Sequence, residues 1–275
     1  MLKQRIVTAA ILIALLVAAL FYFPIGWMAV LFGLFIAAAG WEWATLSGLK
    51  KFSAKIVYVI GLLIFGVLGM IGVFQQPHLV LSFFLAATLW WIWIAIDIFS
   101  RTDFKRGMFT TFNGKMVGGF LVLVPSWIAL VYLLAQDLEA PRTLLYMFVL
   151  VWVADSAAYF TGSFFGKHKL APQISPGKTW EGVLGGIIGA VLLAWLCGTM
   201  VWNYDAEMLL RWIGLAGITG LVSVIGDLTE SKLKRIAKVK DSGKWLPGHG
   251  GVLDRIDALT AAAPVFVLGT IVLKF

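Results

Sequence analysis

Charge is scarce in this 275-residue sequence: Asp, Glu, Lys and Arg together make up only 13%, about half of their share in soluble domains. Cysteine is nearly absent as well. The single residue, Cys197, excludes an intrachain disulfide and a thiolate metal cluster, and its expected role is packing within an apolar run. The alternation of apolar and polar residues that marks a membrane β-barrel is also missing. The sequence is therefore neither a soluble domain nor a membrane barrel.

What the sequence has in abundance is apolar residues, at 61% of the chain with a mean hydropathy of +0.93. Nine runs approach the length of about 20 residues that a helix needs to cross a bilayer. We expect an all-α, polytopic integral membrane protein with helices at 6–23, 26–47, 55–74, 79–99, 116–135, 143–163, 182–202, 208–228 and 257–273. The run 116–135 is the weakest, because it begins with Gly118 and Gly119. The first run exceeds the apolar core of an ordinary signal peptide, so we expect an uncleaved helix.

The distribution of charge among the loops predicts the orientation. If the N-terminus is cytoplasmic, alternate connections collect 19 of the 22 Lys and Arg residues, and only Arg142, Arg211 and Lys274 fall on the other side. This bias indicates cytoplasmic basic loops in a multi-pass protein of a bacterial-type plasma (inner) membrane. The net charge of +8 then reflects topology and attraction to anionic membrane lipids, not binding of nucleic acid. We divide the chain into N-terminal transmembrane helices (1–142) and a C-terminal transmembrane catalytic region with longer cytoplasmic loops (143–275).

One carboxylate, Asp155, falls deep inside a predicted span. A charge at that position is costly, so it needs a partner, a wet cavity or a function. Asp155 and Tyr159 are four residues apart and share a helix face. Two interpretations stay open: a structural hydrogen bond between helices, or a face that lines a polar cavity.

The segment "ISPGKTWEG" (174–182) contains Gly-Lys-Thr, which suggests a P-loop. We reject that interpretation, because a Walker A motif needs glycine where Pro172 stands and no strand is expected before it. A Ser-Pro-Gly-Lys-Thr turn that leads into a helix still suits phosphate, since helix amides, two hydroxyls and the Lys178 ammonium would converge on an anion. The alternative is a simple loop in which Thr179 caps the helix.

The strongest departure from the apolar pattern is the stretch 231–257, which holds ten of the 36 charged residues. Asp227, Glu230 and Ser231 share one face at the end of the eighth span, and Asp254 and Asp257 open the last span. Two helix ends thus present carboxylates at the same depth. Oxygen donors of this kind suit Mg²⁺, which keeps water ligands and bridges to substrate phosphates.

Between these helix ends lie basic side chains and the segment "PGHGG", which together offer positive charge and unobstructed backbone amides to a phosphate. Each part also has a simpler interpretation. The basic residues could only anchor the loop on the cytoplasmic side, His249 could be a turn residue, and Asp254, Arg255 and Asp257 could form a local salt bridge. All three features together are less easily explained in this way.

These residues match a known pattern. Ser231-x-x-Lys234-Arg235, Lys240-Asp241 and Pro247-x-His249-Gly250-Gly251-x-x-Asp254-Arg255-x-Asp257 resemble the signature of phosphatidate cytidylyltransferases, or CDP-diacylglycerol synthases. The segments "GDLTES", "ISPGKTWEG" and "ADSAAYFTG" are similar to that family too. The resemblance covers residues 151–257 well and the first half only as generic hydrophobic helices.

The resemblance implies that CTP and phosphatidic acid react to give CDP-diacylglycerol and pyrophosphate with Mg²⁺, in a homodimer with a polar funnel open to the cytoplasm. By analogy and geometry, Asp227 and Asp254 would be the metal ligands. The candidates for catalysis are Asp227, Ser231, Lys234, Arg235 and Asp254. The candidates for substrate binding are Ser175, Lys178, Thr179, Lys240, Asp241, His249, Gly250, Gly251 and Arg255. Asp155 and Asp257 would support the site, Asp155 as a cavity-lining group and Asp257 by orienting Arg255.

Two cationic segments, one around Lys178 and one from Lys232 to Lys244, offer charge for the lipid phosphate and the leaving pyrophosphate. Two other functions stay open. A CTP-dependent polyprenol or phytol kinase would use similar parts but transfer the γ-phosphate. A transporter or scaffold with a basic lipid-binding loop would leave the carboxylate pairs beside glycine turns unexplained.

Overall fold

The computed structural model describes residues 2–100, 106–137, 139–245 and 250–275, with the backbone alone for residues 2–10 and 12. The helices are α1 (Leu2–Tyr22), α2 (Ile25–Leu46), α3 (Phe52–Gln75), α4 (Pro77–Phe99), α5 (Phe112–Leu134), α6 (Ala140–Phe165), α7 (Trp180–Met200), α8 (Ala206–Ala237) and α9 (Leu253–Leu273). Within the described residues, eight helices are long and apolar enough to cross a membrane, and α1 contributes a shorter apolar stretch, Ile13–Tyr22. The expected all-α, polytopic fold is confirmed.

Two short elements between the helices were not predicted. A 3₁₀ turn, η1 (Met108–Thr110), precedes α5, and a hairpin of β1 (Lys169–Ala171) and β2 (Ser175–Thr179) precedes α7. The strands are antiparallel, with Lys169 opposite Thr179. The expectation that no strand comes before the Ser-Pro-Gly-Lys-Thr segment was therefore wrong, because β1 precedes it and the segment itself forms β2. Three and five residues are too short for the two-residue period of a strand to be visible in the sequence.

Helix α8 continues nine residues past the end predicted for the eighth span, 228, to Ala237. The added residues are mostly good helix formers, and the basic residues Lys234 and Arg235 in the last turn interact favourably with the helix dipole. Lys238 ends the helix in the left-handed conformation, with φ 57°. Ser231, Lys234 and Arg235 consequently stand on a rigid helix and not in a loop.

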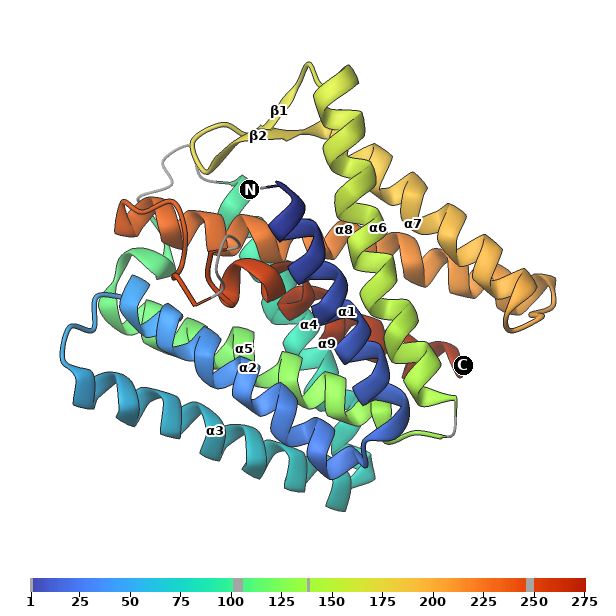
Figure 1. Cartoon of the computed structure of the whole chain (residues 1–275), viewed down its shortest axis with the longest axis horizontal. Coiled ribbons are helices and arrows are strands. Elements are labelled where there is room, and N and C mark those ends of the chain that lie inside the picture. The colour runs from blue at the N-terminus through green and yellow to red at the C-terminus, as the bar shows by residue number, and fades with distance from the viewer. Residues whose placement is uncertain (1, 101–105, 138, 246–249) are drawn as a thin grey trace.

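Helix α9 is the central element of the bundle. Figure 1 shows α2, α3 and α5 side by side in one part of the molecule and α6 and α7 in the other, with α8 and α9 running between them. The middle of α9, residues 260–267, is buried throughout, in contact with α4, α5, α6 and α8. The first turn of α9 and the last turns of α8 therefore lie where the two parts of the molecule meet.

The span that was predicted to be the weakest because of its glycines, α5, is the most buried of the candidate spans in the described chain, with 72% of its apolar window inside the protein. A Cβ at Gly119 would lie 2.0 Å from the Tyr58 hydroxyl oxygen. That hydroxyl donates to the Met116 carbonyl at 3.0 Å, and the Trp43 indole donates to the Lys115 carbonyl at 2.8 Å. Gly119 therefore does not weaken the span, because the missing side chain lets α2 and α3 approach the backbone of α5.

Candidate active site between α8, α9 and the hairpin

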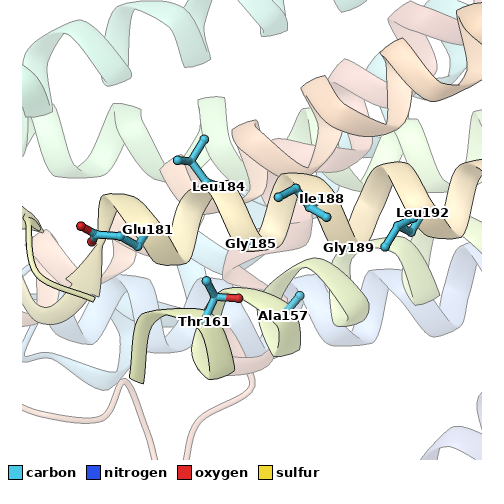
Figure 2. Close-up of a pocket in the computed structure, with 8 residues that line it drawn as sticks. All are labelled: Ala157, Thr161, Glu181, Leu184, Gly185, Ile188, Gly189 and Leu192. Carbon is cyan, nitrogen blue, oxygen red and sulfur yellow. The ribbon is translucent and has the colours of Figure 1, made fainter. Parts of the chain in front are cut away.

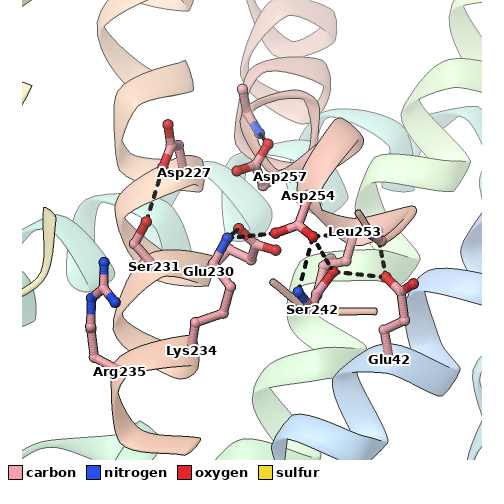
Figure 3. Close-up of polar contacts among 12 residues, drawn as sticks. Glu42, Asp227, Glu230, Ser231, Lys234, Arg235, Ser242, Leu253, Asp254 and Asp257 are labelled. Carbon is pink, nitrogen blue, oxygen red and sulfur yellow. Dashed lines mark hydrogen bonds and ion pairs between the residues drawn. The ribbon is translucent and has the colours of Figure 1, made fainter. Parts of the chain in front are cut away.

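Helices α8 and α9 touch at Gly226, one residue before the first candidate metal ligand. A Cβ at Gly226 would lie 2.3 Å from the Asp257 carbonyl oxygen and 3.2 Å from the Cα of Ala258. Only glycine allows the two backbones to come this close. The contact brings the carboxylates of α8 and α9 together in one cluster (Figure 3).

The first carboxylate of the cluster, Asp227, is held from two directions. The Lys178 ammonium on β2 lies 2.6 Å from its Oδ2 atom, and the side chains of the pair are 23% and 33% exposed. One turn further along α8, the Ser231 hydroxyl donates to Asp227 Oδ1 at 3.2 Å. The structure thus brings three of the predicted site residues together and shows why the hairpin matters: it delivers Lys178 to α8.

The second carboxylate, Asp254, faces Lys234. The Lys234 Nζ atom lies 2.6 Å from Asp254 Oδ1 and 2.5 Å from Glu230 Oε2 (Figure 3). Glu230 is only 1% exposed, so its charge needs a partner inside the protein. The ion pair with Lys234 is what offsets the burial of this charge.

The other oxygen of Asp254, Oδ2, is held by the segment that leads into α9. It accepts hydrogen bonds from the Ser242 amide, the Ser242 hydroxyl and the Gly251 amide, each at 2.9 Å. Gly250 has φ 84°, a left-handed conformation that glycine adopts without strain. A Cβ at Gly250 would also lie 3.0 Å from Asp254 Oδ2. The two glycines therefore shape the turn around this carboxylate.

Two further aspartates lie near these pairs. Asp257 on α9 interacts electrostatically with Asp227, Lys178 and Lys234. Asp155 on α6 interacts electrostatically with Lys178 and Asp227, and its side chain is exposed. An exposed side chain that interacts with Lys178 and Asp227 is compatible with the cavity-lining hypothesis for Asp155.

The remaining predicted residues lie around this cluster. The Arg235 Nε atom donates to the Ile174 carbonyl at 3.0 Å, which ties the hairpin to α8. Ser175 starts β2 opposite Ala171. Thr179 is buried, at 3% exposure, and accepts from the Gly182 amide at 3.1 Å as the N-cap of α7. The structure therefore gives Thr179 the capping role that the sequence left open as an alternative.

Three of the predicted binding residues between α8 and the end of the signature are at the surface. Lys240, Asp241 and Arg255 are exposed, Asp241 lying near Gly250, where a Cβ would be 3.8 Å from that of Asp241. His249 lies outside the described residues.

Lys232 does not have the predicted role. It was expected to offer its charge to a phosphate, but its ammonium forms a buried ion pair with Asp97 of α4, with Nζ and Oδ2 2.7 Å apart and the side chains 1% and 4% exposed. The helical continuation of α8 is the reason, because it turns Lys232 away from Ser231 and Lys234 and towards α4. Lys234 is therefore the first residue of the cationic segment whose charge faces the candidate site.

A groove elsewhere on the protein is separate from this cluster. It lies between α6 and α7, has a volume of about 460 Å³ and is lined mainly by Ala157, Leu184, Ile188 and Leu192 (Figure 2). Its one carboxylate, Glu181, accepts hydrogen bonds from the backbone amides of the hairpin entrance. No residue of the carboxylate cluster lines the groove, so the groove is distinct from the candidate site.

Comparison with known proteins gives a consistent result. A model of the "Cytidylyltransferase family" matches residues 3–272. A phosphatidate cytidylyltransferase of Pseudomonas aeruginosa is 39% identical over 266 residues, covering 97% of this chain and 96% of the relative. The Haemophilus influenzae protein of the same name is 40% identical, covering 97% of both chains. That of Thermotoga maritima is 34% identical, covering 96% of this chain and 94% of the relative.

Proposed function

The chain belongs to the cytidylyltransferase family, and we propose on that premise that it transfers CMP from CTP to phosphatidic acid. An oxygen of the lipid phosphate bonds to the α-phosphorus of CTP, the bond from that phosphorus to the β-phosphate oxygen breaks, and pyrophosphate leaves with the electron pair. The products are CDP-diacylglycerol and pyrophosphate. The observation that carries this proposal is the pairing of two carboxylates, Asp227 and Asp254, with two ammonium groups, Lys178 and Lys234, in one cluster.

The ammonium groups have a double role in this proposal. In the absence of substrate, each ammonium offsets the charge of an aspartate beside it. Phosphate oxygens compete with these aspartates for Lys178 and Lys234, and Arg235 adds a third cation on the same side of α8. Since phosphoryl transfer depends mostly on positioning and charge neutralisation, these cations bind and orient the phosphates.

We propose Mg²⁺ as the cofactor, held by Asp227 and Asp254. The donors fit a hard cation, because the carboxylates of the cluster and the Ser231 hydroxyl beside Asp227 offer only oxygens. No group of three or more His, Cys, Asp or Glu side chains in the described chain is arranged to enclose a metal. Two carboxylates, with water and substrate phosphates as the other ligands, suit Mg²⁺ better than a closed protein cage. When bound, the ion would neutralise charge that develops on the phosphate oxygens.

We place the site at the cytoplasmic surface of a bacterial inner membrane. The positive-inside bias of the loops supports this orientation, and CTP is a cytoplasmic molecule. The cluster lies at the C-terminal end of α8 and the first turn of α9. At a helix end, the phosphate of phosphatidic acid can reach the cluster while its acyl chains stay in the bilayer.

We also propose a homodimer, as the resemblance implies. The apolar groove between α6 and α7, with the exposed side chains Leu184, Ile188 and Leu192 at its rim, offers a surface that a helix of a second copy could cover. Light scattering of the purified protein, with the detergent contribution subtracted, should then give twice the chain mass of 30.1 kDa. A mass of one chain would contradict the dimer.

The direct test of the reaction uses the purified protein in detergent with CTP and phosphatidic acid. We expect CDP-diacylglycerol to form only when both substrates and Mg²⁺ are present, and EDTA to stop its formation reversibly. Diacylglycerol in place of phosphatidic acid is the matched control, since it lacks the attacking phosphate. Product formation from diacylglycerol, or full turnover in EDTA, would contradict the proposed reaction or its cofactor.

A further inference from the structure

A buried carboxylate in the first half of the chain contacts the segment that carries Asp254. Glu42 lies on α2 and is 1% exposed. Its carboxylate accepts three hydrogen bonds from residues about 200 positions later: from the Ser242 hydroxyl at 2.9 Å, the Val252 amide at 3.0 Å and the Leu253 amide at 2.8 Å. Figure 3 shows Glu42 pointing at this segment from the α2 side. None of the predicted site residues comes from that half.

Two of these bonds cap α9. The first amides of a helix have no partner within it, and the residue before α9, Val252, provides no side-chain cap. Glu42 accepts from Val252 and Leu253, and its negative charge at the helix N-terminus is favoured by the helix dipole. The start of α9 is thus fixed from a different helix.

The third bond connects Glu42 with Asp254. The Ser242 hydroxyl oxygen lies 2.9 Å from Glu42 Oε2 and 2.9 Å from Asp254 Oδ2. Because a hydroxyl has a single hydrogen, Ser242 shares that hydrogen between the two carboxylates and so links them. The Ser242 amide also donates to Asp254 Oδ2. As a result, Asp254 directs its other oxygen, Oδ1, at Lys234.

The backbone of the segment packs closely around Glu42. A Cβ at Gly243 would lie 2.1 Å from Glu42 Oε1, and one at Gly251 would lie 2.1 Å from the Ser242 hydroxyl oxygen and 2.5 Å from Glu42 Oε2. A carboxylate held by three donors cannot move aside at low cost. Glycine at both positions lets the segment close around Glu42.

We propose that Glu42 is a positioning residue for cytidylyl transfer: from α2 it anchors the segment 242–253 and, through Ser242, orients Asp254 towards the reacting phosphates. The inference rests on the proposed function, in which Asp254 takes part. Glu42 itself touches no substrate, so its effect passes through Asp254.

The test is Glu42→Gln, with the exposed Glu139→Gln as the matched control. A glutamine keeps the shape but has one acceptor oxygen where Glu42 has two, so at least one donor loses its partner. We expect kcat to fall about ten- to a hundredfold and the Mg²⁺ concentration for half-maximal rate to rise. We also expect hydrogen exchange of the Val252 and Leu253 amides to accelerate about tenfold or more, with the exchange of α2 and α5 unchanged. Glu139→Gln should change none of these.

Ser242→Ala removes the hydroxyl between Glu42 and Asp254 and keeps the bonds from Val252 and Leu253 to Glu42. It also serves as the test variant if Glu42→Gln does not fold. It should lower kcat and leave the Leu253 amide protected, and its effect should not add to that of Glu42→Gln in the double variant. Wild-type kcat and exchange in both variants, or faster exchange throughout the protein, would overturn the positioning role. If the wild-type protein itself does not turn over CTP, the proposed function fails, and the exchange measurement still decides whether Glu42 anchors α9.

Discussion

Replacement of Lys232 by methionine would remove one half of the buried ion pair between α8 and α4. The ammonium lies 2.7 Å from Asp97 Oδ2, and both side chains are almost fully buried. Removing one partner of such a pair costs about 3–5 kcal/mol, because the remaining buried charge loses the opposite charge beside it. For a protein of this size that corresponds to a fall of roughly 6–20 °C in the melting temperature.

The assay is thermal unfolding of the purified protein in one detergent, followed by circular dichroism. The exposed Lys51→Met is the control and should melt within about 2 °C of the wild type, as exposed substitutions do. The double variant Asp97→Asn/Lys232→Met carries neither charge and should regain most of the lost stability. A single variant as stable as Lys51→Met, or a double variant that is less stable by the sum of both effects, would refute the reasoning.

Three other predictions concern the site and its orientation. Asp227→Asn and Asp254→Asn should each leave a folded protein with less than about a tenth of wild-type activity, a loss above about 1.4 kcal/mol; more activity would remove that residue from the metal site. Gly226→Ala should lower activity and stability because its Cβ would meet the α9 backbone, whereas Gly214→Ala, with open space around it, should not; equal melting curves and rates would contradict the close approach. In a cysteine-free background, Lys244→Cys should react with an impermeant thiol reagent only from the cytoplasmic side, and labelling from outside would contradict the orientation.

The helices could be predicted from the sequence because hydropathy and length depend on local composition. All nine predicted helices exist, and most of their ends lie within a few residues of the prediction. Helix α8 was the exception, because its last turns are charged: a hydropathy criterion ends the span where the apolar residues end, while the helix continues to Ala237. The β1–β2 hairpin was missed because its strands are short and polar.

The cluster of Asp227, Lys178, Lys234 and Asp254 could be predicted because its residues belong to motifs with a regular spacing. Glu42 and Asp97 were missed, since their partners lie 200 and 135 positions away and no local pattern connects them. A signal was nevertheless present: both are carboxylates inside predicted apolar spans, and the rule that singled out Asp155 applies to them equally. Such a rule indicates that a partner exists without identifying it.

The central claim, transfer of CMP to a lipid phosphate, is tested most directly with CTP labelled at a single phosphorus. With label at the α-phosphorus, the lipid product should become labelled only when phosphatidic acid is supplied. With label at the γ-phosphorus, all the released label should appear in pyrophosphate and none in lipid. Lipid labelled from the γ-phosphorus would contradict the account and identify a kinase instead.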